Sequence, residues 1–354
     1  FTIDGRAPRA GEIFKYKGMA ETLEELGKTN CESFYRGAIA DAIDSYSRKT
    51  GGYLRKEDLA AYKAQWVEPI TTNYRGYDVW EIPPNGHGIV VLMALNILEG
   101  MDLSAGHDDP ETAHKIMEAL KLAFTDGKRY VADPRAMKPT VEQLLSRDYA
   151  AKRRALIGST ALEPKPGTPY CGDTVYLNAA DGDGNMISYI QSIYCGFGSG
   201  TVLPGTGIVF HNRGNNFTMD ETMENCVAPG KKPYHTIIPG FLSKDGKAVG
   251  PFGVMGGFMQ PQGHVQVLTN MIDFHMNPQE ALDAPRWMWT GEKKISLERL
   301  YNSEMADKLT RTGHDITIPV NSLEFGRGQI ILRDDEGTLC GATEPRTDGT
   351  VAVW

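Results

Sequence analysis

The stretch GDTVYLNAADGDGNMISYIQSIY at residues 172–194 decides the fold expected for this chain. Polar and apolar residues alternate along 174–180 and again along 186–193, and the turn sequence DGDGN at 181–185 separates the two runs. This pattern predicts a β-hairpin. If the turn centres on Asp183, antiparallel pairing places Thr174 opposite Ser192, with both side chains on one face.

The two faces of the predicted hairpin differ in chemistry. One is rich in hydroxyl groups and the other is aliphatic, the first carrying Thr174, Tyr176, Asn178, Ser188, Ser192 and Tyr194 and the second Val175, Leu177, Ala179, Ile187 and Ile193. We therefore expect the aliphatic face to pack on a core and the other face to surround Thr174. A lone threonine at a strand start is most often a plain β-former, so the interpretation needs support from elsewhere in the chain.

Outside the hairpin the sequence is helix-rich first and strand-rich later. Apolar residues recur at helical spacing over 33–47, and a longer helix is expected from Pro110 to Tyr130 behind Asp109 as N-cap. A stretch rich in proline at 162–170 predicts an exposed connector. Further strands are expected at 74–82, 235–242, 247–254, 315–320 and 329–339, and further helices at 89–98, at 262–272 and from 278 onward. This order indicates a layered α+β fold rather than a parallel doubly wound sheet.

Composition excludes several classes of function. The formal charge is −8, from 37 basic and 45 acidic residues in 354, which argues against a nucleic-acid partner. No apolar run is long enough to predict a membrane span. The five cysteines, an odd number with no CxxC pair, exclude a disulfide scaffold or a thiolate zinc site. No motif predicts a nucleotide, a metal or any other cofactor, since the sequence GFGSG at 196–200 does not fit GxGxxG.

A second informative stretch is FGVMGGFM at 252–259. Gly256 and Gly257 lie between a predicted strand and a predicted helix, where successive backbone N–H groups can converge on a developing oxyanion. Spacing alone favours the simpler interpretation, a tight strand-to-helix turn.

Taken together, these stretches resemble the γ-glutamyltranspeptidase family, a branch of the N-terminal-nucleophile amidohydrolases. The resemblance covers essentially the whole chain. Its most specific pieces are GDTVYLNAADGDGN, GFGSGTVLPGTGIVFHNRGNNF, APGKKPYHTIIPGF, VMGGFMQPQGHVQVL, NPQEALDAPRW and GATEPRTDG, with FYRGAIADAI, LRKEDLAAYKA, YRGYDVWEIPP and YVADP upstream.

The resemblance implies a four-layer αββα sandwich, in which two stacked, mainly antiparallel sheets are flanked by helices. It also implies that the precursor cleaves itself between Asp173 and Thr174. Residues 1–173 would be the C-terminal part of the helix-rich large subunit and 174–354 the small catalytic subunit, both building one sandwich. The expected assembly is a heterodimer of these subunits or a dimer of heterodimers.

The same resemblance assigns the catalytic roles. Thr174 Oγ would be the nucleophile, and its freed α-amine, with an ordinary pKa of about 8, the general base. Ser192 occupies the place of the family's threonine that hydrogen-bonds the nucleophile. Gly256 and Gly257 match the glycine pair of the oxyanion hole. No cofactor and no metal are implied.

The substrate-holding positions depart from the glutathione-cleaving members. Where those have an asparagine, a glutamine and an aspartate around the substrate ammonium, this chain has Tyr194, Arg213 and Asn216. His235 and Thr236 replace the paired serines that bind the substrate carboxylate, and the family's carboxylate-binding arginine falls in a region N-terminal to this chain. Because a negative charge is lost and a positive one gained, we expect a small-molecule amide substrate whose acyl group bears a carboxylate.

Several alternatives stay open at this stage. The family default is γ-glutamyl transfer or hydrolysis on compounds of the glutathione type. A related amidase of altered acyl specificity, acting on oxamate, glutaryl cephalosporins or poly-γ-glutamate, is the second possibility. A non-catalytic homologue used as a binding module is the third.

Four smaller features of the sequence carry expectations of their own. Arg286 and Arg346 each follow a proline and are expected to form structural ion pairs, and His87 and His264 are expected to be packing residues. Since the chain begins with Phe1, we expect a processed or truncated product, and any targeting segment would belong to the missing part. The compartment is not fixed by the sequence, and a cytoplasmic location is favoured over a periplasmic or secreted one.

Overall fold

The structure is a computed structural model that describes residues 1–164 and 173–354. The chain divides into two compact units. The smaller unit comprises Phe1–Trp66 and Phe197–Asn212, and the larger comprises Val67–Gly196 and Arg213–Trp354. The expected connector at 162–170 lies mostly outside the described residues.

The smaller unit is helical. Its helices are α1 (Lys17–Lys28), α2 (Glu32–Arg36), α3 (Ala38–Lys49) and α4 (Lys56–Ala61). Ile39, Ile43 and Leu203 form its buried centre. The sequence predicted one helix over 33–47, and the structure breaks it at Gly37, where a Cβ atom would lie 2.9 Å from Ser33 Cα.

A six-stranded antiparallel sheet forms the centre of the larger unit, with the strand order β1-β2-β5-β6-β10-β11. Its strands are β1 (Ile70–Tyr74), β2 (Tyr77–Glu81), β5 (Gly240–Lys244), β6 (Lys247–Met255), β10 (Arg327–Arg333) and β11 (Leu339–Thr343). The strand predicted at 74–82 is confirmed from Tyr77 onward as β2, but its first residues are wrong, because Tyr74 ends β1 and pairs with Tyr77 around a two-residue turn. Strands from both sides of residue 173 build this one sheet.

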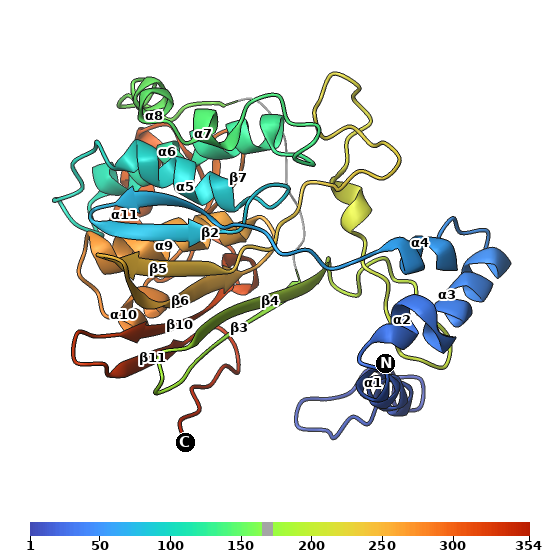
Figure 1. The fold of residues 1–354 in the computed structure, drawn as a ribbon. Coiled ribbons are helices and arrows are strands. Elements are labelled where there is room, and N and C mark those ends of the chain that lie inside the picture. The colour runs from blue at the N-terminus through green and yellow to red at the C-terminus, as the bar shows by residue number, and fades with distance from the viewer. Residues whose placement is uncertain (165–172) are drawn as a thin grey trace. The chain divides into compact units, whose positions relative to one another are not determined.

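Helices cover one face of the six-stranded sheet (Figure 1). The principal ones are α5 (Gly88–Leu98), which is buried throughout, α6 (Pro110–Tyr130) and α9 (Met259–Ile272). The prediction for α6 is confirmed, since the Asp109 carboxylate accepts a hydrogen bond from Thr112 N at 2.7 Å. Smaller elements are α7 (Val141–Leu144), α8 (Arg147–Arg154), α10 (Pro278–Asp283), α11 (Ser303–Arg311), the 3₁₀ turn η2 (Leu323–Phe325) and a second sheet of β7 (Trp287–Gly291), β8 (Lys294–Leu297) and β9 (Asp315–Thr317). Of the helices in the described residues, none combines the length and the apolar character needed to cross a bilayer.

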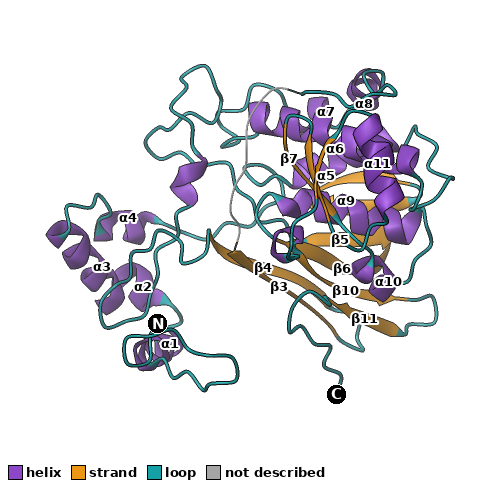
Figure 2. Ribbon diagram, turned by 180° about the vertical axis from the view of Figure 1, so that it is seen from behind, coloured by secondary structure: helices purple, strands orange, loops and turns teal. Residues whose placement is uncertain are grey.

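The hairpin of β3 (Asp173–Ala180) and β4 (Met186–Tyr194) forms a second layer against the six-stranded sheet (Figures 1 and 2). Tyr176 packs on β6 so closely that a Cβ atom at Gly253 would lie 2.5 Å from its ring. Two stacked antiparallel sheets, with helices on the outer face of the larger one, confirm the predicted α+β sandwich.

The predicted orientation of the hairpin is wrong. Thr174 and Tyr176 are 4% and 7% exposed, whereas Val175, Leu177 and Ile187 are 55%, 44% and 55% exposed. The hairpin therefore buries its hydroxyl and aromatic face on the six-stranded sheet. Alternation along a strand separates two faces, but it does not say which face meets the next layer.

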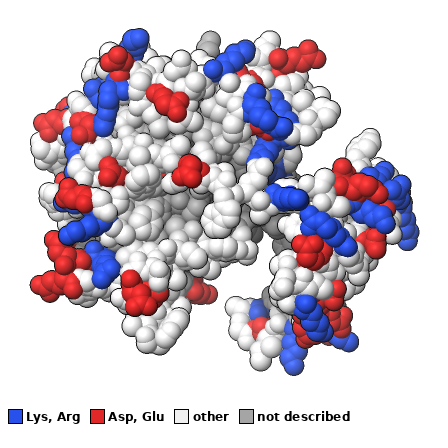
Figure 3. Space-filling model, viewed as in Figure 1, with Lys and Arg blue, Asp and Glu red and all other residues white. Residues whose placement is uncertain are grey.

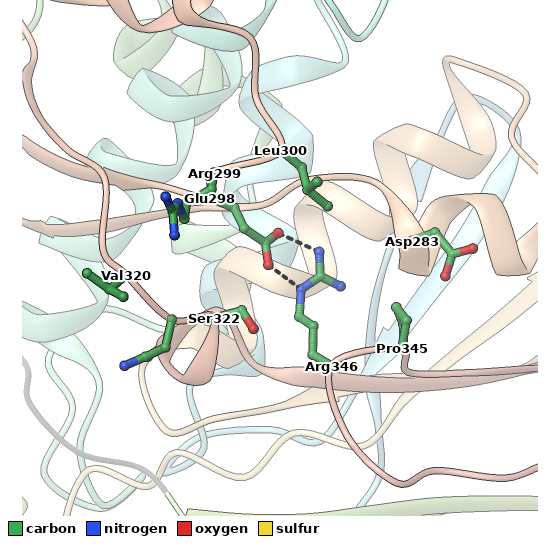
Figure 4. A pocket seen from close by; sticks show the side chains of 9 residues that line it. Asp283, Glu298, Arg299, Leu300, Val320, Ser322, Pro345 and Arg346 are labelled. Carbon is green, nitrogen blue, oxygen red and sulfur yellow. Dashed lines mark hydrogen bonds and ion pairs between the residues drawn. The ribbon is translucent and has the colours of Figure 1, made fainter.

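A buried ion-pair cluster joins the residues just before β7 and just after β8 to the C-terminal segment. Arg286 pairs with Glu344 at 2.9 Å, and Arg346 pairs with both Glu344 at 2.7 Å and Glu298 at 2.5 Å. The Glu298–Arg346 pair lines a cavity of about 400 Å³ (Figure 4). The prediction that both arginines form structural ion pairs is confirmed.

Candidate active site

Thr174 and Ser192 face each other at the end of the hairpin. They are paired residues in the β3–β4 ladder, which confirms the predicted register. Thr174 Oγ donates a hydrogen bond to Ser192 Oγ at 3.1 Å. Main-chain pairing on either side fixes the two backbones in register, which keeps the two side chains opposite each other.

A bulge lies immediately next to Thr174. Thr174 pairs with Ser192 but Asp173 pairs with Tyr194, which leaves Ile193 as an extra residue on β4. Tyr194 takes the left-handed backbone conformation, with φ at 80°, and its N–H donates to Ser192 Oγ at 2.9 Å. The irregularity thus falls on the link between Asp173 and Thr174, the predicted cleavage site. The Asp173 side chain lies outside the described residues.

Gly256 and Gly257 connect β6 to α9, as predicted, with φ at 139° and 58°. A Cβ atom at Gly256 would lie 3.2 Å from Gly326 Cα. Among the described residues, the hydrogen bonds of this turn use the two glycine carbonyl groups, which accept from Met259 N and Gln260 N, and neither glycine N–H donates one.

The crossing of β3 over β6 relates Thr174 to this turn. Asn178 Nδ2 donates to Pro251 O at 3.4 Å, and Tyr176 packs on Gly253. Two residues back along β3 therefore correspond to two residues forward along β6. β3 thus runs antiparallel to β6 where the two cross, and its Thr174 end points toward the Met255 end of β6, which Gly256 follows.

Arg213 is brought to the same end of the hairpin. It begins the 3₁₀ turn η1 (Arg213–Asn216), its guanidinium carbon lies 4.7 Å from the Tyr194 ring centroid, and it donates to Thr236 Oγ1. Burial lowers the pKa of Arg213 to about 10, so the side chain remains cationic at neutral pH. The structure thus gathers Tyr194, Arg213 and Thr236, three of the five predicted substrate residues.

The side chains of Asn216 and His235 form hydrogen bonds with main-chain groups. Asn216 Nδ2 donates to Tyr234 O at 2.9 Å, and His235 Nδ1 accepts from Ile237 N at 3.3 Å. The His235 main chain also bonds Asn85 O and His87 N. Their predicted contact with substrate stays a prediction.

A cluster of aromatic rings packs around Tyr234 of the 234–236 segment. The Tyr234 and Phe258 rings stack at 5.8 Å, and His87 meets both edge-on. His87 is fully buried, which lowers its pKa well below the ordinary value, so it packs here as a neutral ring.

Lys128 lies against the same cluster of aromatic rings and was not among the residues that the sequence pointed to. Its ammonium group lies 5.7 Å from the Phe258 ring centroid and 5.0 Å from that of Trp289, and burial lowers its pKa to about 8. A lysine on an amphipathic helix has the pattern of a solvated face, so no signal in the sequence distinguished it.

One buried cluster has the residue types of a metal site. His114 Nδ1 and His314 Nε2 lie 2.8 Å apart, and Glu118 Oε1 is 3.8 Å from His314 Nε2. The Lys121 ammonium lies 2.7 Å from the same Glu118 oxygen. A cation of the protein itself therefore already balances this carboxylate, which does not favour a metal ion there.

Side chains of both charges are mixed on the surface of the larger unit. On the face shown in Figure 3, acidic and basic side chains of the larger unit are interspersed rather than gathered by sign.

Comparison with known proteins extends over the whole chain. The family model described as Gamma-glutamyltranspeptidase matches residues 1–354. The chain is 36% identical to the glutathione hydrolase-like YwrD proenzyme of Bacillus subtilis and 34% identical to the oxamate amidohydrolase proenzyme of Klebsiella pneumoniae. Each alignment covers 99% of this chain and 68% of the relative.

A solved structure is still more similar. The cephalosporin acylase from Bacillus halodurans superimposes with a TM-score of 0.95 at 57% identity, covering 99% of this chain and 65% of that one. The chain therefore spans about two thirds of the length of these relatives, whose names point to different substrates.

Proposed function

This chain belongs to the γ-glutamyltranspeptidase family, and from that premise we propose that it is an autoprocessing N-terminal threonine amidohydrolase. Its substrates are small amides whose acyl group carries a carboxylate. The observation that carries the proposal is the 3.1 Å contact between Thr174 Oγ and Ser192 Oγ beside a bulged strand start.

In the processing step, Thr174 Oγ attacks the carbonyl carbon of Asp173. The bond from that carbon to the Thr174 nitrogen breaks, which leaves an ester on Oγ and frees the α-amine. Water then hydrolyses the ester, giving a carboxylate at Asp173 and a free hydroxyl at Thr174. The products are residues 1–173 and 174–354.

In turnover, the Thr174 α-amine takes the proton of its own hydroxyl while Oγ attacks the substrate amide. The N–H groups of Gly256 and Gly257 stabilise the oxyanion, and loss of one such donor raises a barrier by roughly 3–4 kcal/mol. The amine product leaves with the proton, and water hydrolyses the acyl ester. Ser192 holds Thr174 Oγ in position through the bond described above.

Arg213 supplies the specificity. A buried guanidinium that stacks on Tyr194 and donates to Thr236 is a cation held in one orientation, and a guanidinium is the side chain that pairs best with a carboxylate. The relative named for oxamate supports this assignment, because oxamate carries a carboxylate next to its amide.

A second candidate is hydrolysis of γ-glutamyl amides, the family default. The similarity to the glutathione hydrolase-like YwrD proenzyme favours it. Arg213 opposes it, since a γ-glutamyl group brings an ammonium as well as a carboxylate. A non-catalytic binding module is the third candidate, and cleavage after Asp173 would exclude it.

The test begins with a denaturing gel and an intact-mass spectrum of the purified protein. We expect two fragments, one beginning with Thr174, and a single uncut chain for Thr174→Ala. Ser188→Ala is the matched control, because Ser188 lies on the same hairpin face but bonds Tyr176. Steady-state kinetics then compare glutaryl, butyryl and γ-glutamyl p-nitroanilides. Turnover of the γ-glutamyl compound alone, or amidase activity retained by Thr174→Ala, contradicts the proposal.

A further inference from the structure

Two asparagine side chains fasten η1 to the 234–236 segment. Asn216 Nδ2 donates to Tyr234 O. Asn225 acts at both ends of its amide, because its Nδ2 donates to Asn216 O at 2.6 Å while its Oδ1 accepts from Tyr234 N at 3.0 Å. Asn225 is only 7% exposed, so water does not readily replace either bond.

We infer that Asn225 is a positioning residue for Arg213. Its amide joins the turn that carries Arg213 to the segment that carries Thr236, the hydroxyl to which Arg213 donates. Asn225 thereby fixes the distance between the cation and its orienting partner without contacting either. The inference rests on the proposed function, in which Arg213 binds the substrate carboxylate.

The neighbours of Asn225 make it a firm anchor. Glu224, next in the chain, is buried and forms an ion pair with Arg129 of α6. Lys231 Nζ donates to the carbonyl groups on either side of Asn225, those of Glu224 at 2.5 Å and Cys226 at 2.7 Å. Thr218 N also donates to Asn225 O at 3.2 Å. The loop that presents Asn225 is thus tied to α6 of the helical layer through Glu224 and Arg129.

The hydrogen bonds of Asn225 to Asn216 O and from Tyr234 N require one donor and one acceptor on the same planar amide group. An ionised aspartate offers two acceptors, so it would repel Asn216 O while still accepting from Tyr234 N. A protonated aspartate again offers one O–H donor and one acceptor. Asn225→Asp is therefore a variant whose defect depends on pH, whereas the amide of Asn225 does not titrate.

The experiment measures KM and kcat of Asn225→Asp and the processed wild-type enzyme with glutaryl and butyryl p-nitroanilide from pH 5 to pH 8.5. For Asn225→Asp at pH 8 we expect the KM for the glutaryl amide to rise about tenfold. We expect kcat and the butyryl KM to stay within about twofold. The glutaryl defect should shrink toward pH 5, as the introduced carboxyl group takes up a proton. Asn215→Asp, an exposed neighbour in η1 that gains the same charge, is the matched control and should match the wild type.

Asn225→Ala separates positioning from folding. It removes both contacts without adding charge, so its glutaryl KM should rise at every pH if it is processed and melts like the wild type. Equal losses on both substrates, or an unchanged glutaryl KM in both Asn225 variants, overturn the inference. If the wild type itself shows no preference for the glutaryl over the butyryl amide, the proposed function fails, and the inference fails with it.

Discussion

Thr174 Oγ and Ser192 Oγ lie 3.1 Å apart across a hairpin whose regular pairing stops at the next residue. Ser192 Oγ also accepts the Tyr194 N–H, so two hydrogen bonds hold it in place, and a neutral serine hydroxyl is a very weak base. Ser192 therefore orients the threonine hydroxyl rather than removing its proton, and the base must be another group.

Replacing Ser192 tests this orienting role. Ser192→Ala should slow both self-cleavage and turnover, because a hydrogen bond worth roughly 1.5–2 kcal/mol corresponds to about ten- to thirtyfold in rate. Ser192→Thr keeps the hydroxyl and should retain most of the activity. The rates are read from a time course on gels and from kcat. If Ser192→Ala cleaves itself at the wild-type rate, the contact has no role in processing.

The turn at Gly256 should tolerate no side chain. Gly256→Ala should lower kcat by at least about a hundredfold, because the added Cβ meets Gly326 and moves a backbone N–H of the oxyanion hole. Gly246→Ala is the control. Gly246 also has a positive φ, at 74°, but lies in the β5–β6 turn with open space around it. That variant should lose stability by about 1 kcal/mol and keep its kcat. Equal kcat losses in both variants contradict a specific role for Gly256.

The contact between Thr174 and Ser192 could be predicted from the sequence because it is local. A short turn and alternating residues fix antiparallel register, and register alone brings the two hydroxyl groups together. The start of α6 was equally local, since an aspartate followed by a proline specifies a helix N-terminus. By contrast, the burial of Tyr176 and exposure of Val175 depend on which sheet the hairpin stacks against, and no local pattern encodes that choice.

The remainder of the site joins distant segments. Arg213 was identified only by resemblance, and the sequence did not show that it would stack on Tyr194 and donate to Thr236. Asn225 was missed because its amide bridges residues nine positions away on either side. An asparagine in a loop carries no such signal, since turns favour that residue for their own reasons.

The ion pair inside the His114–His314 cluster should contribute strongly to stability. Lys121→Met leaves the Glu118 carboxylate buried without its cation, 2.7 Å from where the ammonium was, and should lower the free energy of unfolding by roughly 3–5 kcal/mol. Lys115→Met, on the same helix, breaks the pair with the exposed Glu111 and should cost less than about 1 kcal/mol. Urea titrations followed by circular dichroism give both values. Similar losses in the two variants contradict the assigned difference in burial.

His314 should make the protein sensitive to acid. Burial, together with the charges of Lys121 and Lys293 and the neighbouring His114, lowers the pKa of His314 to about 3. The nearby Glu118 carboxylate does not reverse this. Between about pH 6.5 and pH 3 the unfolded chain therefore binds a proton that the folded chain does not. This contribution to stability is complete above about pH 6.5 and is lost as the pH falls toward 3.

His314→Gln removes the titrating group and should flatten this part of the stability profile, though it also loses the bond to His114 and so starts from a lower value at pH 7. His275→Gln, at an exposed histidine, should leave the profile unchanged. Denaturant unfolding at pH 7, 6, 5 and 4 measures the slope for each variant. A His314→Gln profile as steep as that of the wild type assigns the acid sensitivity to other groups, the buried His87 first among them, because burial lowers its pKa in the same direction.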